Sequence, residues 1–155
     1  MEALVYLFYW LYAALLVGAA IIDIRSHRIE PRLVCAMFGV AAIKTALEVV
    51  SNEMYLTSLW AALISGAVTT LVFWGMYRFS HGIGLGDVKL MAAAGLFYSV
   101  RGIFTIVIFS MLLVAAAGVI MIIKSRSNLK AELPFAPFVA AAAIIREIMI
   151  LTDKL

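Results

Sequence analysis

Residues 3–22 contain no charged side chain, and this run has the length of about 20 residues that a helix needs to cross a bilayer. We interpret it as a retained helix and not as a signal peptide, because no basic segment precedes it. Five more apolar stretches follow, at residues 33–50, 59–76, 87–100, 102–123 and 135–151. The sequence therefore predicts an all-α polytopic membrane protein with six transmembrane helices, and residues 1–155 are expected to form a single membrane-embedded domain.

The composition excludes two other classes of protein. Hydrophobic residues make up 66% of the chain and charged residues 14%, whereas ordinary soluble domains have about 45–50% and about 25%. A disordered chain would need few apolar residues and high charge. The net charge of +3 includes no dense run of lysine or arginine, so no nucleic-acid binding is expected. Cys35 stands alone, which excludes an internal disulfide and a cysteine-rich zinc site, and we expect no metal or other cofactor.

Lysine and arginine gather in alternate loops, which sets the expected orientation, because short basic loops stay on the cytoplasmic side. The loops at residues 24–32, 77–86 and 124–134 are predicted to be cytoplasmic, and both chain termini are predicted to lie outside an inner (cytoplasmic) membrane. The basic residues behind this assignment are Arg25, Arg28, Arg32, Arg78, Lys89, Lys124, Arg126 and Lys130, against Arg101 and Lys154 on the other face.

Two aspartates are predicted at the cytoplasmic ends of their helices, Asp23 at the end of the first and Asp87 at the start of the fourth. Carboxylates at membrane depth are costly and are candidates for function. Two of them about 3 Å apart share one proton, so that the ionised member can activate water while the protonated member donates to a peptide carbonyl. A purely structural interpretation is that each aspartate caps a helix. This suits Asp87 better than Asp23, because the dipole at a helix C-terminus disfavours an acid.

Three glycines alternate just before the second aspartate, in the segment His81-Gly82-Ile83-Gly84-Leu85-Gly86-Asp87. Glycine allows a positive φ and a close approach of the backbone, and an extended peptide substrate would need such room beside an acid. Exposed backbone at membrane depth is tolerated where it lines a cavity. A flexible turn between two spans would explain the glycines equally well.

At these residues the chain resembles the type IV prepilin peptidases, a group of GxGD intramembrane aspartyl proteases. The resemblance covers essentially the whole chain. The matching segments are Ile22-Asp23-Ile24-Arg25-Ser26-His27-Arg28-Ile29, Gly84-Leu85-Gly86-Asp87-Val88-Lys89-Leu90 and Pro134-Phe135-Ala136-Pro137-Phe138.

The resemblance implies a membrane aspartic endopeptidase that removes the short basic leader of prepilins or pseudopilins at the cytoplasmic face. It implies Asp23 and Asp87 as the catalytic pair. Substrate-binding or site-shaping roles are expected of Gly84, Gly86, Lys89, Pro134 and Pro137, although Lys89 is equally well explained as reaching anionic lipid, and prolines commonly begin helices for steric reasons. The expected partners are the prepilin substrate and membrane lipid.

The chain departs from the family pattern in two places. Larger members carry an N-terminal segment with paired cysteines and an N-methyltransferase activity, so the expectation here is a short form that does not methylate its product. Glu30 separates Ile29 from Pro31, where many relatives read Ile-Pro directly.

Three other functions remain as alternatives. A small proton- or ion-coupled transporter would use the same two aspartates, although it would be expected to hold them near the bilayer midplane. A protease of the signal-peptide-peptidase or presenilin type would have more spans and a Pro-Ala-Leu motif. A non-catalytic membrane scaffold would need neither aspartate.

Overall fold

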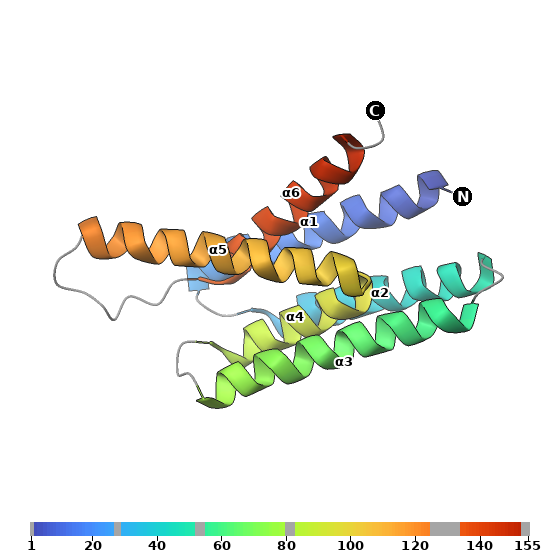
Figure 1. Ribbon diagram of the computed structural model, residues 1–155, viewed down its shortest axis with the longest axis horizontal. Helices are drawn as coiled ribbons and strands as arrows, with labels where there is room; N and C mark the ends of the chain where they lie inside the picture. Colours follow the sequence, from blue (N-terminus) through green and yellow to red (C-terminus); the bar gives the residue numbers. More distant parts are fainter. Residues whose placement is uncertain (1, 27–28, 52–54, 80–82, 125–133, 153–155) are drawn as a thin grey trace.

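In the computed structural model, residues 2–26, 29–51, 55–79, 83–124 and 134–152 are described. These residues form six α-helices and no strand, which confirms the predicted all-α class (Figure 1). The helices are α1 (Glu2–Ser26), α2 (Pro31–Ser51), α3 (Tyr55–Phe79), α4 (Leu85–Phe97), α5 (Val100–Lys124) and α6 (Ala136–Thr152).

Four of the helices, α1, α2, α3 and α5, are long and apolar enough to cross a membrane. With 13 residues, α4 extends over only about 20 Å, and the 17 residues of α6 over about 26 Å. Both are shorter than the hydrocarbon core of a bilayer, which is about 30 Å thick. The six predicted helices are therefore present, whereas six complete membrane crossings stay a prediction.

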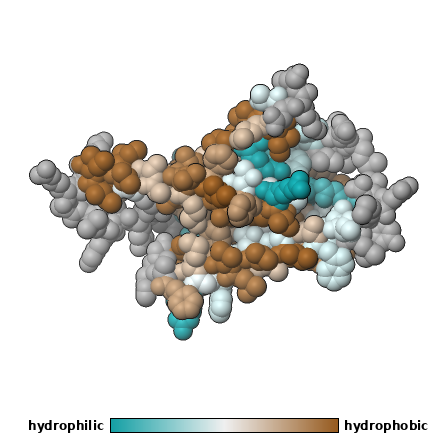
Figure 2. Space-filling model, in the orientation of Figure 1, coloured by the Kyte–Doolittle hydropathy of each residue, from teal (hydrophilic) through white to brown (hydrophobic). Residues whose placement is uncertain are grey.

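Large apolar side chains cover the outer faces of α3 and α5, as Figure 2 shows for one side of the molecule. Leu71 of α3 is 66% exposed, and Phe104 and Leu112 of α5 are 67% and 60% exposed. A protein in water rarely exposes a continuous apolar surface of this kind. The surface suits a surrounding of lipid chains, as the composition predicts.

The short helix α4 packs against α2 and α3, while α1 packs along α6 (Figure 1). The contact between α3 and α4 is close because Gly95 has no side chain. A Cβ atom there would lie 2.9 Å from the Ser65 carbonyl oxygen and 2.8 Å from Thr69 Oγ1. At the end of α4, the Phe97 ring stacks on Tyr12 of α1 with ring centroids 3.9 Å apart. These contacts fix α4, which carries Asp87, against three other helices.

The end of α4 differs from the sequence prediction, which continued this helix to Val100. The chain leaves the helix at Tyr98, whose ψ is 137°. The last carbonyl groups of the helix find donors on neighbouring helices: the Lys44 ammonium donates to the Phe97 carbonyl at 2.9 Å, and the Ser65 hydroxyl donates to the Gly95 carbonyl. A helix can end inside an apolar fold because its free carbonyls are satisfied in this way.

Candidate active site

Asp23 lies in the last turn of α1 and is almost completely buried, with 6% of its surface exposed. Its Oδ2 atom accepts a hydrogen bond of 3.1 Å from the backbone N–H of Ala136, the first residue of α6. The first N–H groups of a helix have no partner within the helix, and its dipole favours a negative charge at this end. The start of α6 thus offsets the unfavourable position of Asp23 at the end of its own helix.

Asp87 is the third residue of α4, and its Oδ2 atom accepts a hydrogen bond of 3.0 Å from the N–H of Gly84. The bond closes the first turn of the helix, as an acidic side chain at this position commonly does. The carboxylate of Asp87 is therefore held by backbone from its own chain segment, whereas that of Asp23 is held by a distant helix.

Of the three glycines before Asp87, Gly84 and Gly86 lie within the described residues, and their surroundings differ. Gly84 has an ordinary extended backbone, with φ of −83° and ψ of 156°, so it has no need of a positive φ. At Gly86 the reason is a close approach, since a Cβ atom there would lie 3.3 Å from the Cβ atom of Ile29. A glycine can be needed for a positive φ or for a close approach of the backbone. At Gly86 the structure shows the close approach.

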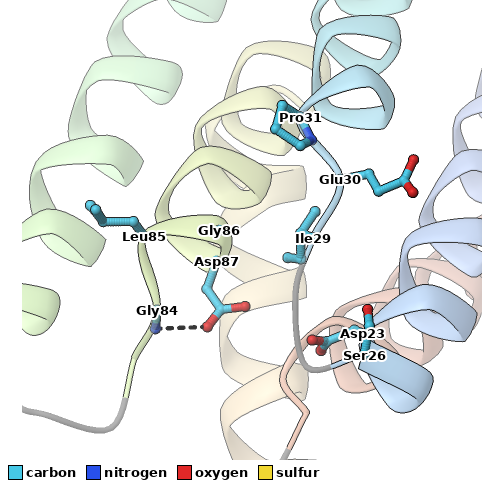
Figure 3. Close-up of a pocket in the computed structure, with 9 residues that line it drawn as sticks. All are labelled: Asp23, Ser26, Ile29, Glu30, Pro31, Gly84, Leu85, Gly86 and Asp87. Carbon is cyan, nitrogen blue, oxygen red and sulfur yellow. Dashed lines mark hydrogen bonds between the residues drawn. The ribbon is translucent and has the colours of Figure 1, made fainter.

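The two aspartates line one cavity of about 630 Å³ (Figure 3). Its walls come from the end of α1, the connection to α2 and the start of α4. The lining residues are Asp23, Ser26, Ile29, Glu30, Pro31, Gly84, Leu85, Gly86 and Asp87. The cavity thus joins two of the three segments that carry the family resemblance.

The carboxylates of Asp23 and Asp87 lie close enough to interact electrostatically. In the view of Figure 3, Ile29 lies between them, with its side chain against Gly86. Two carboxylates that interact across a partly enclosed cavity have the composition of a general acid–base pair.

The remaining predicted site residues lie outside this lining. Lys89 is exposed on α4, and Pro134 and Pro137 are half-buried around the start of α6. These two prolines flank Ala136, whose N–H holds Asp23. Their placement suits support of the helix start that positions the carboxylate, and among the described residues they do not contact the cavity.

The sequence reasoning did not assign Ser26, Ile29 or the backbone of Ala136 to the site. Ser26 and Ile29 follow Asp23 by only a few positions, so their nearness in the chain was a usable signal. The Ala136 N–H had no comparable signal, because a backbone donor 113 residues away leaves no trace in side-chain patterns.

The fold and the cavity together define a helical membrane protein with a site of paired carboxylates. The chain belongs to the Type IV leader peptidase family, whose model matches residues 10–119. It is therefore a member of a family of peptidases, as the sequence resemblance implied, and the match gives no support to a transporter.

Curated proteins similar to the chain are named as peptidases too. Leader peptidase HopD of Escherichia coli is 28% identical over 87% of this chain and 88% of its own length. The protein of the same name from Salmonella typhimurium is 29% identical over 92% of each chain. The prepilin leader peptidase/N-methyltransferase of Bacillus subtilis is 30% identical over 86% of this chain and 52% of its own length. No solved structure matches the chain.

Proposed function

We propose that this protein is an aspartic endopeptidase that removes the leader peptide of type IV prepilins or pseudopilins. The observation that carries the proposal is the cavity in which Asp23 and Asp87 come together although 64 positions separate them in the sequence. Family membership and the names of the relatives from Escherichia coli and Bacillus subtilis support the reaction and the class of substrate.

In the proposed mechanism the two carboxylates share one proton. The ionised carboxylate takes a proton from a water molecule as this water attacks the scissile carbonyl carbon. The protonated carboxylate donates its proton to the carbonyl oxygen, which gives a tetrahedral intermediate. We assign the acid and base roles to the pair and not to either residue, because coupled groups titrate together. The hydrogen bonds from Ala136 and Gly84 would keep the two side chains oriented.

The proposed location is the inner membrane, with α4 and α6 embedded beside the four longer helices and the cavity at the cytoplasmic face. The distribution of basic residues supports this orientation. The loop that carries Arg126 and Lys130 lies outside the described residues. Fusion of a reporter that is active only outside the cytoplasm tests it: a reporter attached after residue 155 should be active, and one inserted in the loop at residues 77–86 should be inactive.

Cleavage of a prepilin in membranes tests the function. The chain is co-expressed with a panel of prepilins, and the loss of the leader is followed as a size shift. We expect the wild type to cut at least one substrate and both Asp23→Asn and Asp87→Asn to lose about 10²–10⁴-fold in rate, the usual contribution of a general acid or base.

Glu48→Gln is the matched control, because it also changes a carboxylate to an amide but lies near the opposite end of α2, where Glu48 pairs with Lys44 at 2.9 Å. It should retain cleavage, and all variants must be present in the membrane at wild-type level. Cleavage by Asp87→Asn at the wild-type rate would refute the proposed mechanism.

A further inference from the structure

A second cavity, of about 220 Å³, lies between the start of α5 and the second half of α6. It shares no lining residue with the cavity of the two aspartates. Arg146 follows Ala136 by ten positions, so about 15 Å of helix separate it from the N–H group that holds Asp23. The residues that line the second cavity are Arg101, Gly102, Thr105, Arg146, Met149 and Ile150.

The guanidinium group of Arg146 is fixed by its neighbours. Its Nη1 atom donates a hydrogen bond to the carboxylate of Glu147. Its central carbon lies 5.0 Å from the ring centroid of Tyr98 and 5.7 Å from that of Tyr9, which is within the range of cation–π attraction. Only 13% of the side chain is exposed. A side chain held in this way loses little conformational freedom when it binds a ligand.

The edge of Arg146 that Glu147 does not use lies against Gly102. A Cβ atom at this glycine would lie 2.8 Å from the Nη2 atom of Arg146 and 3.0 Å from its Nε atom. Within the part of the chain that the structure describes, only Nη1 of Arg146 has an acceptor. The Nε and Nη2 atoms carry parallel N–H groups, the pair with which arginine binds two oxygens of one phosphate. Gly102 thus lets this pair lie at the wall of the cavity.

Arg101 adds a second guanidinium group to the lining. This residue is exposed, and it forms no ion pair with any residue in the described ranges. Arg146 and Glu147 are neutral as a pair, and no aspartate or glutamate is among the lining residues, so the charge of Arg101 is left uncompensated. The basic loops do not account for Arg101, because in the predicted orientation it lies on the face that carries few cations.

The surroundings of the two arginines are those of a membrane surface. Met149 lines the cavity and is 51% exposed, and Phe104, three positions after Arg101, is 67% exposed. Figure 2 shows hydrophilic surface between the start of α5 and α6, with apolar surface beside it. Pockets that enclose drug-sized ligands have about 300–1,000 Å³, so a cavity of about 220 Å³ suits a smaller group such as phosphate.

We propose that this second cavity binds the phosphate group of an anionic ligand, with Arg146 as a bidentate donor and Arg101 as a second cation. Basic pockets between membrane helices bind lipid head groups in this way, and the apolar side chains of Met149 and Ile150 suit a phosphate carried by a lipid. Free phosphate has the same chemistry. The site does not depend on the proposed peptidase function, because none of its residues takes part in cleavage.

The test uses purified full-length protein in detergent, to which phosphatidylglycerol or phosphatidylcholine is added, and counts the bound lipid by native mass spectrometry. We expect the wild type to bind one phosphatidylglycerol at least about tenfold more tightly than phosphatidylcholine. Arg101→Gln should weaken the binding of phosphatidylglycerol about tenfold, which is the size of one hydrogen bond to a charged group. Arg101→Lys should retain part of the affinity, because lysine keeps the charge but cannot bind two oxygens in parallel.

Arg78→Gln is the matched control, since Arg78 is also an exposed arginine but lies at the end of α3, outside the cavity. It should bind phosphatidylglycerol as the wild type does, which separates a site from general attraction by positive charge. Gly102→Ala, whose Cβ atom would displace the free edge of Arg146, should weaken the binding as well. Equal affinity of the wild type and Arg101→Gln for phosphatidylglycerol overturns the proposal, and so does equal binding of the two lipids by the wild type.

Competition with inorganic phosphate distinguishes the two sources of the phosphate group. If phosphatidylglycerol stays bound to the wild type at a large excess of inorganic phosphate, the site takes its phosphate from a lipid. If inorganic phosphate displaces the lipid from the wild type, the site also accepts the free anion. A protein that retains neither phosphatidylglycerol nor inorganic phosphate contradicts the proposal.

Discussion

The Oδ2 atom of Asp23 accepts a hydrogen bond of 3.1 Å from the backbone N–H of Ala136, across 113 positions of sequence. The bond ties the last turn of α1 to the first turn of α6, and it involves a carboxylate that we propose to be catalytic. Asp23 therefore has two separable roles. It accepts a hydrogen bond from a helix start, which an amide oxygen can also do, and it exchanges a proton, which an amide cannot do.

Two substitutions at Asp23 should separate these roles. Asp23→Asn keeps an acceptor for the Ala136 N–H, so it should be nearly as stable as the wild type and inactive in cleavage. Asp23→Ala removes the acceptor as well and should cost about 0.5–2 kcal/mol of stability, as the loss of a helix cap does. Thermal unfolding in detergent, followed by the loss of helical circular dichroism, measures the difference. Equal unfolding temperatures of the two variants would mean that the bond contributes nothing to stability.

The glycine segment before Asp87 gives a second prediction. Gly86→Ala places a Cβ atom 3.3 Å from that of Ile29. The connection between α1 and α2, which carries Ile29 and lines the cavity, then has to shift. Overpacking of this kind costs about 1–3 kcal/mol, so we expect a loss of prepilin cleavage. Gly84→Ala should be milder, because a Cβ atom there would meet the Asp87 Oδ2 atom at an ordinary 3.5 Å and the backbone is extended.

A second substitution in the Gly86→Ala background identifies the cause of that loss. Ile29→Ala removes the outer atoms of the side chain that the new methyl group would meet at 3.4 and 3.5 Å. The double variant should recover part of the cleavage rate that Gly86→Ala loses. If it recovers none, the outer atoms of Ile29 are not the reason for glycine at position 86, and the 3.3 Å contact with the Cβ atom, which alanine retains, remains as the cause.

The features that could be predicted from sequence are those with a local signal. The apolar runs predict the helices, and the pairing of Lys44 with Glu48, expected from their spacing of four residues, is confirmed at 2.9 Å. The meeting of Asp23 and Asp87 could also be predicted, because the alternation of basic loops placed both at the cytoplasmic ends of their helices, Asp23 at a C-terminus and Asp87 at an N-terminus.

The features that could not be predicted depend on contacts between distant segments. The Ala136 N–H is a backbone group, and Lys44 reaches the Phe97 carbonyl across 53 positions. No periodicity in the sequence encodes such bonds. The early end of α4 has the same origin, since the donors that satisfy its last carbonyls belong to α2 and α3. Glu30 looked like an insertion into a family motif until the structure placed it in the cavity lining.

A third prediction concerns Lys44, whose ammonium group donates to the Phe97 carbonyl and is only 6% exposed. Lys44→Ala leaves this carbonyl without its donor and should cost about 1–3 kcal/mol of stability. Glu48→Gln removes the partner of the more exposed end of the pair and should cost about 0–1 kcal/mol. Unfolding in detergent should rank the variants in this order. An equal loss in both would show that the ion pair, and not the cap on α4, is the stabilising contact.

The close contact of α3 with α4 gives the last prediction. Gly95→Ala would place a Cβ atom 2.9 Å from the Ser65 carbonyl oxygen, and backbone cannot yield as a side chain can. We expect α4 to be pushed away from α3, a loss of about 1–3 kcal/mol in stability, and reduced cleavage, because Asp87 moves with the helix.

Gly39→Ala in α2 is the matched control, since no atom lies within 4 Å of a Cβ atom there. It should leave stability unchanged or raise it by up to about 1 kcal/mol, because alanine is the better helix former. Unfolding temperatures and cleavage rates of both variants check the prediction. A Gly95→Ala protein as stable and as active as Gly39→Ala would mean that α3 and α4 are not packed as closely as described.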